Sequence, residues 1–345
     1  MKINTFDYES AHQQMLHFLG NDKNLVISIL VHNNPDGDAL SAGLALCMVL
    51  KKMLHNVKII APNKYSDNLK WLPQIENVFI CNTIFQETII SHVKKSSHII
   101  CIDFSRKSRT DSNIVQLLKD KNILVIDHHQ DKPEFQTDHV IHNPNASSSS
   151  EIVFELLERG FAQYIDEDVA KCIYTGIMTD TDRFTTSNVS YRVHEIVGKL
   201  LHNYDIPVSN IYNAIYSISF NRMKFIGFIF DQCVSIIQNT KVAYVVINKS
   251  IIKKYGLNTE DTNGIVNDVL LLKNIVMVAL FKSDDQGIRI SFRSKGNFDV
   301  NEFAKKNFNG GGHKNASGGV SRLPLKVTIN KFISIIKSID ELKYV

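Results

Sequence analysis

The chain has 345 residues, of which 44% are hydrophobic and 21% are charged, and its formal net charge at pH 7 is +4. This length predicts two domains, and the composition is that of a soluble globular protein rather than a disordered or fibrous one. The mildly positive charge is compatible with a small anionic substrate, but it does not by itself indicate a nucleic-acid partner.

The cysteine content and the N-terminus indicate the cellular compartment. The five cysteines are odd in number, widely scattered and mostly within apolar stretches, so we expect buried, reduced thiols in a cytoplasmic protein rather than a disulfide framework. The N-terminus lacks the cationic and apolar regions of a signal peptide, and no run of 18 apolar residues occurs. We therefore expect no membrane span.

The N-terminal part of the chain alternates apolar strands with helical stretches after a lead-in helix at residues 5–20. We expect strands at residues 25–31, 57–61, 77–81, 99–102 and 123–126, and helices at residues 114–118, 151–159, 167–178 and 191–201. The run Asn145 to Ser150 is expected to provide the N-cap of the helix at 151–159, with Gly160 as its stop. This alternation predicts an α/β fold with a parallel sheet and helices on both faces.

A second pattern starts near residue 233, after a predicted helical connector at residues 205–232. It comprises expected strands at 242–247, 275–281 and 288–293, helices at 263–272, 300–306 and 329–339, and a glycine-rich loop at 310–312. The sequence therefore predicts an N-terminal domain at 1–204, the connector, and a smaller C-terminal α/β domain at 233–345.

Four apolar stretches each lead into side chains that can bind metal ions. These side chains are His32, Asp36 and Asp38 after the first stretch, then Asp103, then Asp127-His128-His129, and finally Asp180. The last stretch, 173–184, follows the strand pattern of the other three, although residues 167–178 also fit a helix. Ligands of open α/β sheets bind at the carboxyl ends of the strands.

Each of these carboxylates taken alone is more simply a turn or cap residue. Four carboxylates in one site would instead be costly without neutralisation, and two divalent cations would balance their charge. Mixed carboxylate and imidazole ligands suit Mn²⁺ and its neighbours better than a thiolate zinc site.

These motifs resemble those of the DHH phosphoesterase superfamily. Asp127-His128-His129 matches the motif that names it, and the first, second and fourth motifs correspond to His32 to Ala39, Asp103 to Arg109, and Gly176 to Thr181. Residues 310–318 are similar to the glycine–histidine signature of the associated DHHA1 domain. The resemblance covers about residues 20 to 322 and favours the stand-alone NrnA-like group, whose members degrade very short oligoribonucleotides and dephosphorylate 3′-phosphoadenosine 5′-phosphate.

The resemblance implies a role for each motif residue. His32 and Asp36 would bind one metal ion, Asp38, His128 and Asp180 a second, and Asp103 would bridge the two. The ions would be Mn²⁺, with Mg²⁺ or Co²⁺ as alternatives. His129, Asp103 and Arg109 would be catalytic, and the substrate would be bound in a cleft between the domains by Arg293, Gly310, Gly311, Gly312 and His313.

Some of these roles have simpler alternatives. Arg109 lies in a basic run and could be only a solvated arginine, and three consecutive glycines could form only a flexible turn. Asp127 could orient a histidine or cap the following turn. The sequence also departs from the family pattern at two places. After the first motif, Ser41-Ala42 stand where the family usually has Gly-Ser. After Thr-Asp-Thr of the fourth motif, Asp182 stands where the family has glycine, and Arg183 follows it.

The expected activity is metal-dependent hydrolysis that releases mononucleotides from short RNA or DNA oligonucleotides, or AMP from 3′-phosphoadenosine 5′-phosphate. Phosphodiesterases of linear or cyclic dinucleotides and exopolyphosphatase-like enzymes are alternatives that the motifs do not separate. A RecJ-like exonuclease and a binding protein without turnover are two further alternatives. A homodimer is compatible with the sequence.

Overall fold

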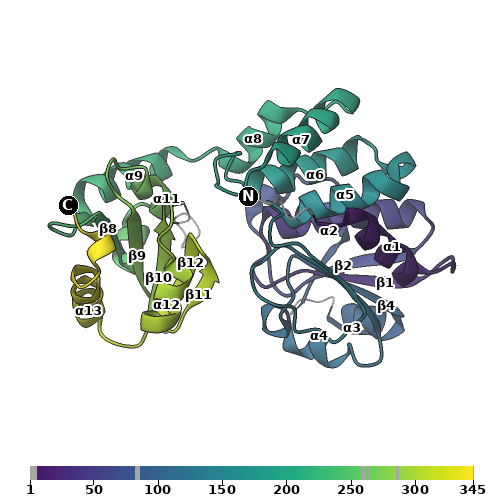
Figure 1. Ribbon diagram of the computed structural model, residues 1–345, viewed down its shortest axis with the longest axis horizontal. Coiled ribbons are helices and arrows are strands. Elements are labelled where there is room, and N and C mark those ends of the chain that lie inside the picture. Colours follow the sequence, from purple (N-terminus) through teal and green to yellow (C-terminus); the bar gives the residue numbers. More distant parts are fainter. Residues whose placement is uncertain (1–5, 82–85, 258–261, 263, 285–286, 345) are drawn as a thin grey trace. The chain divides into compact units, whose positions relative to one another are not determined.

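The computed structural model describes residues 6–81, 86–257, 262, 264–284 and 287–344, and the chain forms two compact units (Figure 1). The first unit is Met1–Ser217 and the second is Ile218–Val345. The predicted connector is divided between them, since α8 (Val208–Tyr216) belongs to the first unit and α9 (Phe220–Gln232) to the second. No helix in the described part of the chain is both long and apolar enough to cross a membrane, and a cytoplasmic location remains a prediction.

The first unit contains a six-stranded sheet in the order β3-β2-β1-β4-β5-β6, and every neighbouring pair is parallel. The strands are β1 (Val26–Leu30), β2 (Asn56–Ala61), β3 (Val78–Ile80), β4 (His98–Ile102), β5 (Asn122–Asp127) and β6 (His139–His142). The predicted parallel sheet is confirmed. Strand β6 was not predicted, because its four residues include two histidines and give little apolar signal.

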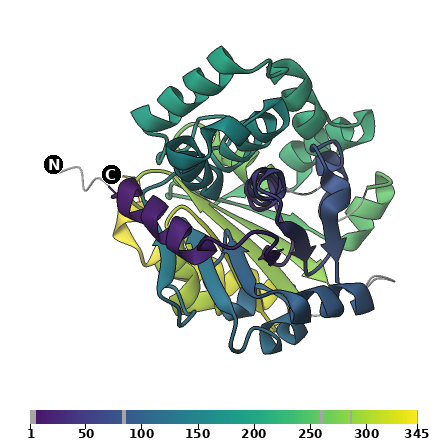
Figure 2. The ribbon, with the colours of Figure 1, turned by 90° about the vertical axis from the view of Figure 1, so that its right-hand side faces the viewer.

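Helices cover both faces of this sheet (Figures 1 and 2). They are α1 (Tyr8–Leu19), α2 (Gly37–Lys52), α3 (Gln86–Lys95), α4 (Ser112–Gln116), α5 (Ser149–Gly160), α6 (Glu167–Asp180) and α7 (Tyr191–Asn203). Apolar side chains of α1, α2, α5, α6 and α7 share one core with the sheet, and those of α3 and α4 share another. Both faces of the sheet are therefore buried, as the apolar strands require.

Strands β1 and β4 are neighbours in the middle of the sheet, β2 lies on the other side of β1, and β5 lies on the other side of β4. The order of the strands therefore reverses between β1 and β4, and ligands of such sheets bind outside the carboxyl ends at this position. The residues that follow β1, β4 and β5 are those with the predicted metal-binding side chains.

The prediction that residues 173–184 follow the strand pattern is wrong, because Ile173 to Asp180 form the C-terminal part of α6. This helix packs closely against α2 at Gly37 and, through its own Gly176, against the first turn of α5. A Cβ atom on Gly37 would lie 2.5 Å from the Thr179 hydroxyl, and one on Gly176 would lie 1.9 Å from the Ser150 hydroxyl. The close contact brings the end of α6, with Asp180, to the start of α2.

The second unit contains a six-stranded mixed sheet in the order β11-β12-β10-β9-β8-β7, in which only β8 and β9 pair in parallel. The strands are β7 (Val234–Ile236), β8 (Val242–Ile247), β9 (Met277–Asp284), β10 (Gly287–Ser294), β11 (Gly311–His313) and β12 (Ala316–Ser321). One core joins the sheet to α12 (Val300–Phe308) and α13 (Leu325–Lys337), and another joins it to α9, α10 (Lys249–Lys254) and α11 (Ile265–Leu270).

The expected glycine-rich loop is largely a strand. Gly311 to His313 form β11, which pairs with β12 at one end of the sheet order. A Cβ atom on Gly310 would lie 1.9 Å from the carbonyl oxygen of Gly318, and one on Gly312 would lie 2.6 Å from that of Ala316. Close packing within the second unit thus explains two of the three glycines.

We predict that Gly310→Ala destabilises the second unit by about 2–3 kcal/mol, because the added methyl group collides with backbone that cannot move away. Gly311→Ala is the matched control, since its Cβ would meet side chains instead of backbone, those of Asn301 at 3.5 Å and Lys305 at 3.9 Å. Calorimetric unfolding of the full chain measures both. Equal losses from the two variants would contradict the packing argument.

Candidate metal centre

The predicted metal-binding side chains meet at the carboxyl edge of the first sheet, around Asp103. His32 Nε2 lies 3.3 Å from Asp103 Oδ2, and His128 Nε2 lies 3.4 Å from Asp103 Oδ1. All three side chains are buried. The two oxygens of one carboxylate therefore face two different histidines, as a bridging ligand requires.

The six side chains form two sets that could each hold an ion. Potential ligand atoms of His32, Asp36 and Asp103 lie within 4.8 Å of one another, and so do those of Asp38, His128 and Asp180. This grouping corresponds to the predicted division between two ions. Asp103, His128 and His129 form a third, overlapping set. Ligation itself remains a prediction.

Backbone carbonyls select the tautomer of both histidines. His32 Nδ1 lies 2.8 Å from the Asn33 carbonyl oxygen, and His128 Nδ1 lies 3.4 Å from that of Ala146. A carbonyl only accepts, so each neutral ring carries its proton on Nδ1 and presents the lone pair of Nε2 toward Asp103. The buried His32 Nε2 has no hydrogen-bond partner of good geometry among the described residues. This donor arrangement fits a divalent cation.

The start of α5 holds two of the carboxylates. Asp38 accepts hydrogen bonds from the backbone amides of Ser149 at 2.7 Å and Ser150 at 2.9 Å, and the Ser149 hydroxyl donates to Asp103 Oδ1 at 2.8 Å. Amides in the first turn of a helix lack partners within the helix and lie at its positive end, so they stabilise a buried anion.

The sequence predicted only a capping role for this serine run. Ser148 is the cap, because its hydroxyl accepts from the Glu151 amide. The contacts of Ser149 and Ser150 with the carboxylates were missed. The available signal was a run of four serines directly before a helix and shortly after the third motif.

Asp103 has an unusual backbone conformation, with a φ of 64°. Residues other than glycine rarely adopt the left-handed region, and such strain concentrates at functional sites. The Asp103 amide donates to the Ile126 carbonyl at 2.9 Å, which ties the residue to β5. The surrounding contacts thus impose the conformation that directs this carboxylate toward both histidines.

Asp127 orients the other histidine of the third motif. Its Oδ1 accepts from His129 Nδ1 at 2.7 Å and from the His129 amide at 3.2 Å. His142, at the end of β6, lies with Nε2 2.6 Å from the His129 carbonyl oxygen, a contact that sequence analysis did not anticipate. Burial would raise the pKa of Asp127, but the hydrogen bond with His129 outweighs it and lowers that pKa. Asp127 Oδ1 thus orients the His129 ring and caps the following turn, so the structure shows both roles that were open for Asp127.

The clustered charges shift the pKa values of the site when no cation is bound. Burial and the nearby Asp103 carboxylate raise the pKa of Asp38 to about 7. Burial would lower the pKa of His32, but its interactions with the carboxylates of Asp103 and Asp36 raise it to about 10. The pKa of Asp180 is raised well above its ordinary value by burial and by neighbouring carboxylates. Such a site favours bound positive charge.

Two domain models match the chain. Residues 26–177 match the N-terminal domain of the DHH family, and residues 239–342 match the DHHA1 domain. The chain belongs to the DHH family. The predicted membership is thereby confirmed, and the two matched segments lie in the first and second units.

Relatives of this DHH-family chain resemble it over most of their length. It is 29% identical over 289 residues to the bifunctional oligoribonuclease and PAP phosphatase NrnA of Bacillus subtilis, covering 83% of this chain and 86% of that protein. An exopolyphosphatase-related protein from Bacteroides fragilis is 30% identical, with a TM-score of 0.89 and 98% of both chains covered. RecJ of Thermus thermophilus shares the fold, with 11% identity, a TM-score of 0.54, and 98% of this chain but 56% of RecJ covered.

The remaining predicted residues of this DHH-family chain are Arg109 in the first unit, and Arg293, His313 and the glycine stretch 310–312 in the second. Arg109 is exposed, and its guanidinium has no hydrogen-bond or ion-pair partner among the described residues, although its carbonyl oxygen accepts from the Asn33 amide at 2.6 Å. Arg293 lies on β10 and His313 on β11 of the second unit. The Gly312 amide donates to Asn301 Oδ1 and that of Gly310 to the Ala304 carbonyl, so both already have partners within that unit.

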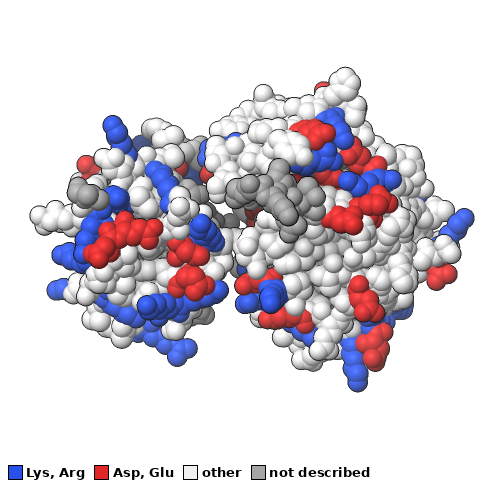
Figure 3. All heavy atoms as spheres, viewed as in Figure 1, with Lys and Arg blue, Asp and Glu red and all other residues white. Residues whose placement is uncertain are grey.

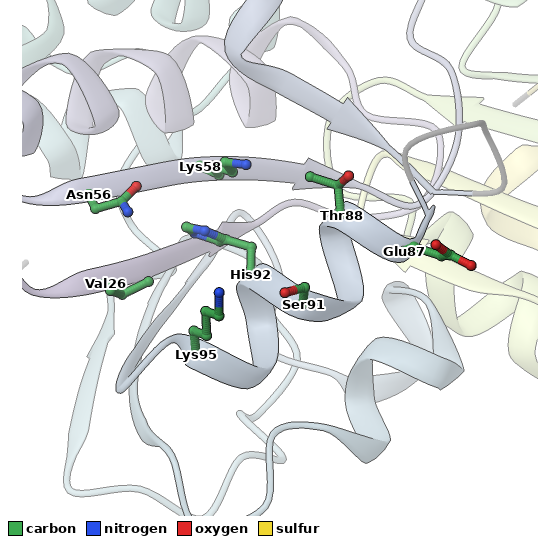
Figure 4. Close-up of a pocket in the computed structure, with 8 residues that line it drawn as sticks. All are labelled: Val26, Asn56, Lys58, Glu87, Thr88, Ser91, His92 and Lys95. Carbon is green, nitrogen blue, oxygen red and sulfur yellow. The ribbon is translucent and has the colours of Figure 1, made fainter.

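A separate hollow of about 480 Å³ lies beside α3 (Figure 4). It is lined by Val26, Asn56, Lys58, Glu87, Thr88, Ser91, His92 and Lys95. Val26 and Asn56 begin β1 and β2, so the hollow lies toward the amino ends of the strands, away from the clustered carboxylates. It is therefore not part of the candidate metal centre.

We predict that Ser149→Ala weakens Mn²⁺ binding about 10- to 100-fold, the usual cost of removing a group that orients a metal ligand. Titration calorimetry on the full chain measures the affinity. Ser147→Ala is the control, because that buried hydroxyl has no hydrogen-bond partner among the described residues. An equal loss of affinity in both variants would show that the Ser149–Asp103 hydrogen bond has no special role.

Proposed function

We propose that this protein is a metal-dependent phosphohydrolase that releases mononucleotides from short oligoribonucleotides and AMP from 3′-phosphoadenosine 5′-phosphate. The observation that carries the proposal is the pair of ligand sets on opposite oxygens of the buried Asp103. The similarity to the Bacillus subtilis oligoribonuclease and PAP phosphatase supports the substrate class.

The donor groups suit two divalent cations, with Mn²⁺ as the expected ion. His32 and Asp36 would hold one, Asp38, His128 and Asp180 the other, and Asp103 would contribute to both. Bound there, the cations would supply Lewis-acid activation of water and neutralise the phosphoryl oxygens. The orphaned Nε2 of His32 and the fixed tautomers of both histidines are the features that fit this role.

The protein's own residues prepare the site for hydrolysis. Asp127 accepts a hydrogen bond from His129 Nδ1, which leaves Nε2 as the ring nitrogen that can face a substrate. In the protonated ring this Nε2 would donate to a phosphate oxygen as negative charge develops there. The first turn of α5 keeps Asp38 ionisable in a buried position. Arg109 would add a guanidinium to the phosphate of the substrate.

The second unit would bind the rest of the substrate. It is rich in lysine and arginine, whereas acidic residues prevail in the first unit, and a basic unit attracts polyanions. We assign substrate contacts to Arg293, His313 and the glycine stretch 310–312, of which Gly311 has the most room for an approaching group. These few phosphate-binding groups can neutralise only a few phosphates, and we therefore expect short substrates.

The exopolyphosphatase-related protein from Bacteroides fragilis motivates polyphosphate hydrolysis as a second candidate. A substrate panel separates the two. With Mn²⁺, purified protein should release mononucleotides fastest from oligoribonucleotides of roughly two to five nucleotides and should dephosphorylate 3′-phosphoadenosine 5′-phosphate. Preference for polyphosphate, a cyclic dinucleotide or a long single strand would contradict the proposal.

Asp103→Asn should abolish turnover, and near-normal turnover by that variant would refute the bridging role.

We predict that His313→Ala leaves Mn²⁺ binding unchanged but lowers kcat/KM on short oligoribonucleotides at least about tenfold, because positioning of the phosphate can contribute several kcal/mol. Steady-state kinetics combined with metal titration measure both effects. His202→Ala, which removes an exposed histidine of the first unit, is the control. Unaltered kinetics of His313→Ala would mean that the second unit binds substrate through other residues.

The shifted pKa of His32 predicts that metal binding releases protons. A cation needs the neutral ring, but without a cation this ring stays protonated up to about pH 10. Metal affinity should therefore rise with pH across the neutral range. Calorimetry in buffers of different ionisation enthalpy reports the released protons, and a binding enthalpy independent of the buffer would contradict the raised pKa of His32.

The raised pKa of His32 also affects folding stability in the cation-free protein. It stabilises the fold fully below about pH 6.5, and this stabilisation is lost as the pH rises through about 10.

A further inference from the structure

The segment directly after Asp180 has a strained backbone. Asp182, Arg183 and Phe184 have φ values of 41°, 64° and 64°. L-residues other than glycine enter this left-handed region singly and at a cost, and asparagine or aspartate tolerates it best. Three successive residues in this conformation need contacts from the surrounding structure to keep them there.

Local contacts explain part of this conformation. The Thr181 hydroxyl accepts from the Phe184 amide at 3.1 Å, and the Arg183 amide donates to the Met178 carbonyl at 2.9 Å. The Phe184 ring packs on the core of the first unit, 6.1 Å from the Tyr174 ring. These contacts close the turn, but they do not involve the charged side chains that distinguish it.

The Arg183 side chain fastens this turn to α8. Its Nε and Nη2 donate to Asp182 Oδ1 at 3.0 and 2.8 Å, and its guanidinium carbon lies 5.0 Å from the centroid of the Tyr216 ring. Burial would lower the pKa of Arg183, but the Asp182 carboxylate and the Tyr212 phenol raise it. A guanidinium over a tyrosine face is attracted by the ring, and more strongly when partly desolvated.

The position of Asp180 depends on this turn, whereas hydrogen bonds from α5 hold Asp38 and Asp103. Asp38 is buried and held by two helix amides, and Asp103 is held by the Ser149 hydroxyl. The Asp180 side chain is 29% exposed and lies 3.4 Å from His128 Nε2, and within the described part of the chain no hydrogen-bond donor holds its carboxylate. Its position therefore follows from where α6 ends and how the next residues turn.

We propose that Asp182, Arg183 and Tyr216 form a positioning unit that holds Asp180 in place to bind a cation. Asp182 stands where the family pattern has glycine, and it supplies both a backbone that tolerates positive φ and the acceptor that orients Arg183. Tyr216 is the last residue of α8 and anchors the guanidinium. The inference rests on one part of the proposed function, the binding of a metal ion by Asp180.

The test is Mn²⁺ titration calorimetry on the full chain. Arg183→Ala should weaken the binding step that uses Asp180 about 10- to 100-fold, as loss of an orienting group usually does, and leave the other step unchanged. Tyr216→Leu, which removes the ring, should have a similar effect, whereas Tyr216→Phe, which keeps it, should bind nearly as the unaltered protein does. Asp182→Asn should produce a smaller loss in the same direction.

Arg159→Ala is the matched control. The Arg159 guanidinium also lies over a tyrosine ring, 5.3 Å from that of Tyr8, and also pairs with a carboxylate, that of Glu155. Glu155 keeps its other partner, Arg192, in this variant. Mn²⁺ affinity should therefore not change.

Three results would overturn the proposal. Unchanged Mn²⁺ binding by Arg183→Ala, with a raised KM, would show that Arg183 contacts the substrate instead. An equal loss of affinity in Arg159→Ala would show general destabilisation. Absence of Mn²⁺ binding by the unaltered protein would remove the role of Asp180. If the unaltered protein binds Mn²⁺ but hydrolyses none of the panel, while Arg183→Ala weakens binding, the proposed function fails and the positioning unit stands.

Discussion

The structure of the first unit depends on how it compensates negative charge at one edge of its sheet. The reversal of strand order between β1 and β4 brings carboxylates from three segments together, and the end of α6 adds a fourth. Unpaired buried carboxylates are costly. Two imidazoles, the positive end of α5 and a serine hydroxyl supply part of the compensation. Divalent cations are the compensation that also provides chemistry.

The groups around this edge differ in how firmly they are held. Asp38 and Asp103 are buried, and elements of the sheet and α5 direct their oxygens. Asp180 is partly exposed at the end of a helix, where a strained turn and a cation–π contact replace direct hydrogen bonds. Precise sites require support around each ligand, and here that support is built differently for each carboxylate.

The second unit shows how one sequence feature can have two explanations. The glycines at 310 and 312 are needed because β11 and β12 leave no space for side chains. Their amides already have partners within the unit. Substrate contacts in this unit are therefore better sought at His313, Arg293 and Gly311 than in the backbone of the whole stretch. Packing and binding make separate demands on neighbouring residues.

The family, the parallel sheet and the set of six candidate ligands could be predicted from the sequence alone, because apolar strands followed by polar residues are local patterns. It did not distinguish helix from strand at residues 173–184, since short apolar runs fit both when buried. The run of four serines was a signal for the start of α5, but it did not identify Asp103 as the partner of Ser149, and the sequence gave no sign that Arg183 lies over Tyr216. Only the tertiary structure determined these contacts, because they join residues far apart in the chain, and their geometry depends on how helices pack against the sheet and against one another.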